Sequence, residues 1–170
     1  MTAKEYNQCV TGCADDVMRF AVRCGCRRED CEDAVQEALA SLWSHREGVA
    51  AAKGKKYLLS AAYRRLMSHF RHAAVVQEYA TTSQTMAPAY QMPDEGFDIK
   101  DAIERSLEAL PEVQRAVLQL RDVEGYSYSE IGETLSLSDQ QVQVYLFRAR
   151  VAMRKQLKTM GYDNDRRQQL

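Results

Sequence analysis

The sequence predicts an all-α protein of two small helical domains joined by a flexible linker. Proline is absent before Pro88 and the first 78 residues contain only four glycines; these two residues disfavour helix interiors most strongly. Apolar residues recur at helical spacing in both halves, and strand-type alternation is scarce. We expect a first domain over residues 1–78, a linker over 79–97, a second domain over 98–157 and a C-terminal tail over 158–170.

The first domain is expected to contain three helices. One runs from about Ala3 to Arg23, a second begins near Glu29 and Asp30, whose carboxylates suit a helix N-terminus, and a third spans about 55–72. The second helix has an apolar stripe and a polar, acidic opposite face. The stripe contains Val35, Ala38, Leu39, Leu42 and Trp43, and the opposite face contains Glu32, Asp33, Gln36 and Glu37.

The stretch from residue 80 to residue 97 interrupts the helical pattern. It is rich in threonine and contains Pro88, Pro93 and Gly96. Clusters of this composition are typical of linkers.

The second domain carries clear helix-start signals. Pro111 suits the first turn of a helix that runs to about Asp122 and is closed by Gly125. Two capping boxes follow, from Ser127 to Glu130 and from Ser138 to Gln141. They predict a short helix through Leu135 and a longer one to about Leu157. Two helices joined by so short a turn have the proportions of a helix-turn-helix.

The start of the last helix presents side chains that can contact DNA bases. The outward residues are Gln140, Gln143, Val144, Phe147 and Arg148. An amide can pair with adenine, and arginine with guanine or phosphate. Many helical hairpins bury such patterns without touching DNA, but the double capping box and short turn favour DNA binding.

Charge is unevenly distributed along the chain, whose formal net charge is only −1. Residues 1–72 carry a net +3 and residues 73–110 a net −5. No acidic residue occurs between Gly48 and Gln77, a run that contains Lys53, Lys55, Lys56, Arg64, Arg65 and Arg71. This run is a candidate phosphate-binding face, with a solvated helix face as the alternative.

The chain shows no sign of catalysis. It has no Walker loop, HExxH motif, dinucleotide fingerprint or ordered catalytic triad, and its three histidines are not spaced as a metal set. The five cysteines are an odd number without export signals, which argues against a disulfide framework, and their spacings lack the C-x2-C pairs of structural zinc sites. We expect buried or incidental thiols, no metal, no cofactor, no small-molecule substrate, no membrane insertion and a cytoplasmic location.

Two separate motif sets resemble the extracytoplasmic-function (ECF) sigma factors of bacterial RNA polymerase. Residues 15–43, above all the run Arg28-Glu-Asp-Cys-Glu-Asp-Ala-Val-Gln-Glu37 with Leu42-Trp43, resemble sigma region 2, and residues 56–71 are similar to the basic segment that follows it. Leu110-Pro111, Gly125 to Ile131 and Val142 to Arg154 resemble region 4. Both sets appear in the family's order and spacing.

The resemblance implies three contact surfaces. One docks on the clamp helices of the largest polymerase subunit and corresponds to Asp33, Gln36, Glu37, Leu39 and Leu42. A second opens and holds the −10 promoter element through charge and stacking faces, which here are Lys53, Lys55, Lys56, Tyr57, Tyr63, Arg64 and Arg65. A third contacts the −35 element through Gln140, Gln141, Gln143, Val144, Tyr145, Phe147 and Arg148.

The −35 surface departs from the family pattern. The family usually has Lys or Arg where this chain has Gln143 and Tyr145, and Gly where it has Ser136. Fewer phosphate contacts reduce both affinity and its dependence on salt. We therefore expect weak −35 binding by the free protein and stable promoter recognition only within the polymerase holoenzyme.

The resemblance predicts a non-catalytic alternative sigma factor whose partners are core RNA polymerase, promoter DNA and an anti-sigma factor. A plain helix-turn-helix regulator would leave the acidic helix and the acid-free run unexplained. A polymerase-binding interaction protein without promoter recognition stays open because the last helix is so weakly charged. A thiol- or metal-sensing variant is a third alternative.

Overall fold

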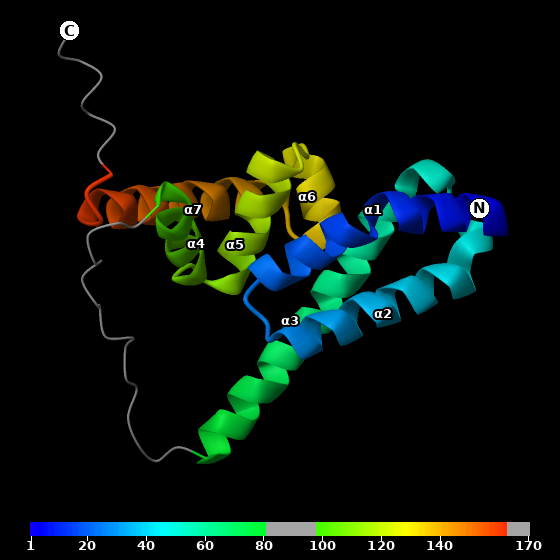
Figure 1. Cartoon of the computed structure of the whole chain (residues 1–170), viewed down its shortest axis with the longest axis horizontal. Helices are drawn as coiled ribbons and strands as arrows, with labels where there is room; N and C mark the ends of the chain where they lie inside the picture. Colours follow the sequence, from blue (N-terminus) through cyan, green and yellow to red (C-terminus); the bar gives the residue numbers. More distant parts are fainter. Residues whose placement is uncertain (81–97, 163–170) are drawn as a thin grey trace, which may run out of the picture.

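The computed structural model describes residues 1–80 and 98–162, with side chains omitted for residues 73–80. Every regular element within these residues is helical, as the sequence predicts (Figure 1). Most of the predicted linker and residues 163–170 of the predicted tail lie outside the described residues. No helix in the described part of the chain is both long and apolar enough to cross a bilayer.

The first domain consists of α1 (Ala3–Arg23), α2 (Arg28–His45) and α3 (Gly54–Ala80), with short 3-10 turns η1 (Arg46–Gly48) and η2 (Ala51–Lys53) before α3. The three predicted helices are confirmed, but α3 continues eight residues beyond the expected end at residue 72. The helices pack through apolar side chains that are almost completely buried. They include Val17, Phe20, Ala34, Ala38, Leu42, Leu58, Leu59 and Leu66.

The second domain consists of α4 (Ile99–Glu108), α5 (Glu112–Leu118), the π-helical turn η3 (Gln119–Val123), α6 (Tyr128–Leu135) and α7 (Asp139–Thr159). Pro111 is the N-cap of α5, one position before the predicted first turn. Both predicted capping boxes are present: the backbone N–H of Ser127 donates to Glu130 (2.8 Å), and that of Ser138 to Gln141 (2.9 Å).

The turn between α6 and α7 contains a serine in the left-handed region. Ser136 has φ +59° and ψ +47° at the C-cap of α6. This conformation costs an L-residue about 1–2 kcal/mol, whereas glycine adopts it freely. Ser136 therefore destabilises the turn of the helix-turn-helix, and the packing of α6 and α7 compensates for this cost.

Ser136→Gly is expected to stabilise the protein by about 0.5–1 kcal/mol, because relief of the left-handed strain outweighs the entropy that glycine adds to the unfolded chain. Urea unfolding followed by circular dichroism measures the change. Ser129→Gly is the matched control: Ser129 is exposed inside α6, where glycine is expected to destabilise by up to about 1 kcal/mol. Destabilisation by both substitutions would contradict the prediction.

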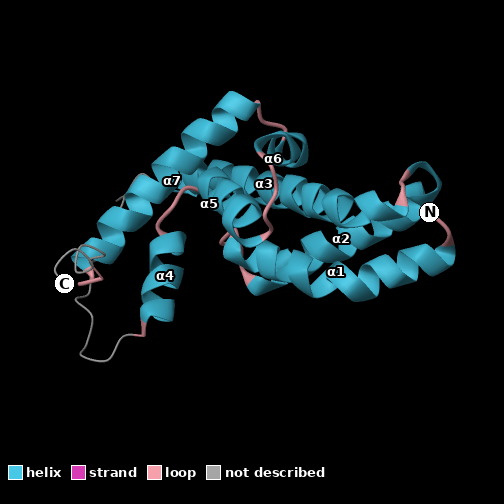
Figure 2. Ribbon diagram, turned by 90° about the horizontal axis from the view of Figure 1, so that it is seen from above, coloured by secondary structure: helices cyan, strands magenta, loops and turns pink. Residues whose placement is uncertain are grey.

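The two domains pack directly on each other. Helix α6 contacts α3 and α5 contacts α1 (Figure 2). Buried residues of both domains form one continuous apolar cluster. Gly25, with φ +92°, lies at the turn after α1 directly against Arg115 of α5, so that a Cβ at position 25 would overlap the guanidinium. The second domain therefore rests on the α1–α2 turn and on the start of α3.

Candidate polymerase and nucleic-acid interfaces

One face of α7 is fixed by packing and the other is exposed. Val142, Leu146 and Ala149 are buried, which turns the predicted DNA-contacting residues outward. Phe147 is 69% exposed and Val144 41% exposed, and Val151 extends this apolar strip along the helix. Of the predicted set, Gln140, Gln143 and Arg148 are also exposed, Tyr145 is half-buried, and the side-chain oxygen of Gln141 is used in the capping box.

The exposed face of α7 carries little positive charge near its N-terminus. Arg148 is exposed there, but Arg150 forms an ion pair with Asp122 of η3 at 2.6 Å. Arg154 and Lys155 are exposed further along the helix. The part of α7 suited to a DNA groove therefore offers amides and apolar side chains with one nearby cation.

The acidic side of α2 is exposed as the sequence predicts. Asp33, Gln36 and Glu37 are exposed, Glu37 forms an ion pair with Arg65 of α3 at 2.7 Å, and Leu39 is half-buried. Leu42 differs from the expectation because it is completely buried in the core of the first domain. It has no surface to offer to a polymerase in this structure and acts by holding α2 in place.

Trp43 was expected on the core stripe, but the structure leaves it 42% exposed. The guanidinium carbon of Arg46 lies 4.1 Å from the centre of its ring, and Tyr6 packs edge-on at 5.0 Å. An exposed aromatic held in one orientation is typical of interface anchors. In the sequence, only the position of Trp43 at the edge of the apolar stripe of α2 pointed to its exposure.

Two of the three lysines of the acid-free run, Lys55 and Lys56, are paired with carboxylates from elsewhere in the chain. Lys55 Nζ lies 2.7 Å from Asp16 of α1 and 2.6 Å from Glu124 of the second domain. Lys56 forms an ion pair with Glu133 of α6. Two of the predicted −10 residues are thus bound to the second domain, and no sequence signal identified these acidic partners.

The charges in this cluster are mutually stabilised. Partial burial opposes the charge on Lys55, but hydrogen bonds to Asp16 and Glu124 raise the pKa of its amine above the usual value. The hydrogen bond from Lys55 lowers the pKa of Asp16, and the one from Lys56 lowers that of Glu133. Lys55, Asp16 and Glu133 are therefore expected to be charged at neutral pH.

The other predicted −10 residues have different surroundings. Lys53 and Arg64 are exposed, and the Arg64 Nε donates only to the Ser60 carbonyl of its own helix at 3.4 Å. Tyr57 is half-buried, with its hydroxyl 2.8 Å from Ser41 Oγ. Tyr63 is 6% exposed, and burial raises the pKa of its hydroxyl. In this structure Tyr63 has almost no exposed surface to offer to a base, and its role at the −10 element stays a prediction.

The cysteines differ from the expectation of incidental thiols. Cys26 and Cys31 form a disulfide, whereas Cys9, Cys13 and Cys24 are free. The spacing of these cysteines in the sequence did not predict the pair, because their contact depends on the conformation of the turn between α1 and α2. Within the described residues, no group of three or more His, Cys, Asp and Glu side chains is arranged to hold a metal ion.

Comparisons with known proteins agree with this architecture. Residues 9–75 match the family model "Sigma-70 region 2" and residues 100–153 match "Sigma-70, region 4". The chain is 29% identical over 150 residues to the ECF RNA polymerase sigma factor SigL of Mycobacterium tuberculosis, in the H37Rv and CDC 1551 strains alike, with 84% of this chain and 83% of SigL covered.

A solved structure shares the fold. The sigma factor RpoE of Bartonella quintana, in complex with the anti-sigma factor NepR, superposes with a TM-score of 0.74 at 18% identity, covering 92% of this chain and 98% of RpoE. The first domain thus corresponds to sigma region 2 and the second to sigma region 4. The chain therefore belongs to the sigma-70 family and is an ECF sigma factor.

Proposed function

We propose that this sigma factor docks on core RNA polymerase through α2 and contacts the −10 and −35 promoter elements through α3 and α7. As an ECF sigma factor it directs transcription initiation. Nucleotide addition belongs to the polymerase, and the sigma factor supplies promoter recognition. The observation that carries the proposal is the simultaneous exposure of the acidic side of α2 and of the outer face of α7.

The docking surface is formed by Asp33, Gln36 and Glu37, with the exposed part of Leu39 beside them. Exposed polar groups around a small apolar contact suit an interface that forms and dissociates. Trp43 extends this surface toward the end of α2. Leu42 supports the surface from the core and is not part of the contact.

The −10 surface lies at the start and on the outer side of α3. Lys53 and Arg64 are exposed there and can contact phosphates directly. Lys55 and Lys56 can do so only after they leave Glu124 and Glu133, since one ammonium cannot hold these carboxylates and a DNA phosphate equally well. Phosphate contacts by Lys55 and Lys56 therefore require these ion pairs between the domains to open, whereas Lys53 and Arg64 are available without that change.

The −35 surface is the exposed face of α7 around Gln143, Val144, Phe147 and Arg148. Amides and a single arginine can contact base edges in the major groove, and an apolar side chain can contact a thymine methyl group. With few phosphate contacts, this surface alone holds DNA weakly. Polymerase must supply the remaining affinity by holding both domains on the promoter.

An anti-sigma factor is the third proposed partner, acting in the cytoplasm where the polymerase is found. The related RpoE of Bartonella quintana was solved in complex with the anti-sigma factor NepR. We infer that a comparable protein restrains this chain.

Transcription with purified core polymerase and a genomic promoter library tests the proposed function. Specific transcripts that depend on this chain are the expected result. Core binding without specific initiation would favour a polymerase-binding interaction protein, and failure to bind core would exclude a sigma factor. A plain helix-turn-helix regulator would bind DNA equally well without polymerase.

The weakly charged face of α7 predicts that promoter affinity depends on polymerase. Full-length protein and holoenzyme are compared on one promoter fragment over a series of salt concentrations. We expect holoenzyme to bind at least about 10³-fold more tightly than the free protein, as specific and non-specific DNA binding typically differ. Tight binding by the free protein, with a steep salt dependence, would contradict this.

A further inference from the structure

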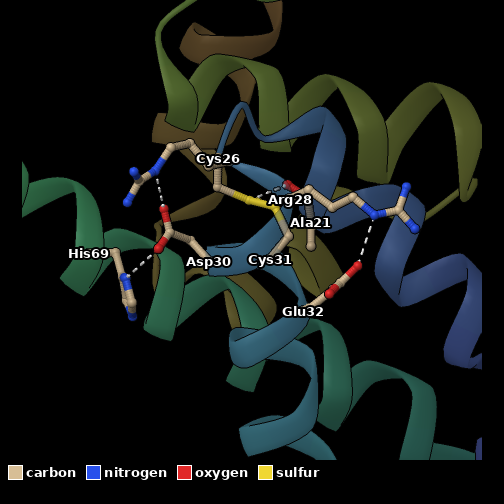
Figure 3. Close-up of a disulfide and its surroundings, with 8 residues drawn as sticks. Ala21, Cys26, Arg28, Asp30, Cys31, Glu32 and His69 are labelled. Carbon is tan, nitrogen blue, oxygen red and sulfur yellow. Dashed lines mark hydrogen bonds and ion pairs between the residues drawn. A yellow bond between two sulfur atoms is a disulfide. The ribbon is translucent and has the colours of Figure 1, made fainter.

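The Cys26–Cys31 disulfide ties the end of α1 to the first turn of α2 (Figure 3). The two Cα atoms are 6.0 Å apart and the cysteines are five residues apart in sequence. A disulfide that closes so short a loop stabilises the fold least, because it removes few conformations from the unfolded chain. Helices α1 and α2 also share an extensive core of their own. The bond is therefore not needed to hold the fold together.

The two sulfur atoms differ in accessibility. Cys31 is completely buried, whereas Cys26 is partly exposed and lines a cleft of about 640 Å³ between α1 and α4. A reagent entering this cleft reaches the sulfur of Cys26. Thiol–disulfide exchange depends on which sulfur is attacked and on access to it, so attack at Cys26 is favoured.

The surroundings accommodate the reduced pair. Cys31 lies at the N-terminal end of α2, where the partial positive charge of the helix offsets part of the cost that burial imposes on a departing thiolate. The Cys26 sulfur lies 3.3 Å from the carbonyl oxygen of Ala21, so a thiol at Cys26 has an acceptor in place (Figure 3). Neighbouring Cys24 does not compete, because burial raises the pKa of its thiol to about 12.

We propose that Cys26–Cys31 is a redox-active site that exchanges with dithiol reductants and that its state controls how firmly the two domains pack. A thiolate of the dithiol attacks Cys26, forms a mixed disulfide and expels Cys31 as a thiolate, which takes up a proton. The second thiol of the reductant then breaks the mixed disulfide and releases Cys26, which also takes up a proton. Two electrons pass to the protein, and the reductant leaves as its own disulfide; the oxidised form of the same reagent reverses the reaction.

Gly25, the residue before Cys26, connects the disulfide to the packing of the two domains. Gly25 abuts the Arg115 guanidinium without room for a side chain, and Arg115 is in turn held by the carbonyl oxygens of Glu108 and Leu110 at 2.9 and 2.8 Å. Reduction removes the covalent tie between the end of α1 and α2, which lets the turn that carries Gly25 shift. Because Gly25 has no free space toward Arg115, a shift of this turn loosens the contact between the domains.

The first experiment measures the redox chemistry of the full-length protein. The protein is equilibrated in mixtures of reduced and oxidised dithiothreitol, quenched with acid, alkylated and mapped by mass spectrometry. Cys26 and Cys31 should become labelled together, with a two-electron dependence on the ratio, while circular dichroism stays native. Free thiols at both positions in fully oxidised reagent, or a bond that opens only on unfolding, would overturn the proposal.

The second experiment measures domain packing by carbodiimide cross-linking, which joins an ammonium to a carboxylate in direct contact. The Lys56–Glu133 and Lys55–Glu124 pairs are suitable reporters. Reduction should lower both cross-link yields about fivefold, the lower end of coupling typical between two sites. Cys26→Ser/Cys31→Ser should give the reduced yield in either buffer, and the control Cys9→Ser should respond like the parent. Equal yields from the oxidised and reduced parent protein would refute the coupling.

Discussion

Arg115→Ala is expected to lower the free energy of unfolding by about 3 kcal/mol, because a charged donor to one buried and one part-buried carbonyl is lost and hydrogen bonds of this kind contribute about 1.5–3 kcal/mol each. Arg115 is only 7% exposed. Its Nη2 donates to the carbonyl oxygens of Glu108 and Leu110, at the end of α4 and in the turn before α5. Without it, the Leu110 carbonyl is left buried without its donor and the part-buried Glu108 carbonyl also loses one.

The expected loss of about 3 kcal/mol is smaller than the sum of the hydrogen bonds of Arg115. The reason is that its Nε is buried without a hydrogen-bond partner in the described structure. That cost reduces the net contribution of the side chain below the sum of its hydrogen bonds. Urea unfolding measures the difference, and Arg150→Ala is the matched control. Arg150 pairs with Asp122 at the surface, where an ion pair contributes about 0–1 kcal/mol. A smaller loss for Arg115→Ala than for Arg150→Ala would show that Arg115 does not hold α4 and α5 together.

Local signals made most of the fold predictable from sequence. The two capping boxes act over three residues, and the apolar stripe of α2 repeats within two turns, so each element carries its own evidence. The main error in a helix boundary was at the end of α3. No proline or glycine follows residue 72 until Pro88, and the helix continues to Ala80 because nothing stops it earlier.

The errors in the candidate site have a common physical origin, which is contact between residues distant in sequence. The acid-free run from Gly48 to Gln77 looked like free positive charge, yet Lys56 pairs with a carboxylate 77 residues away. Tyr63 looked available for stacking, but it is covered in the folded protein. Helical periodicity places a residue on a face of its own helix and says nothing about which other helix covers that face.

Glu124→Gln/Glu133→Gln is expected to increase binding of the protein to core polymerase and promoter DNA by up to about tenfold. The two glutamates hold Lys55 and Lys56 against the second domain. Ion pairs with solvent-exposed partners such as Glu133 are weak, so the effect is limited to about one order of magnitude. Glutamine keeps the size of the side chain and removes the charge, so the balance shifts toward separated domains with both lysines available. Holoenzyme formation and promoter binding are measured by fluorescence anisotropy at fixed salt.

Two further variants separate domain opening from the loss of a DNA contact. Asp16→Asn removes a partner of Lys55 that lies within the first domain, so it should leave the domain contact, and hence promoter affinity, nearly unchanged. Lys56→Ala breaks the same ion pair as Glu133→Gln but also removes the cation. If Lys56 contacts promoter phosphates, Lys56→Ala must weaken DNA binding and its salt dependence while Glu133→Gln strengthens binding. Parallel changes in both variants would mean that Lys56 serves only to hold the domains together.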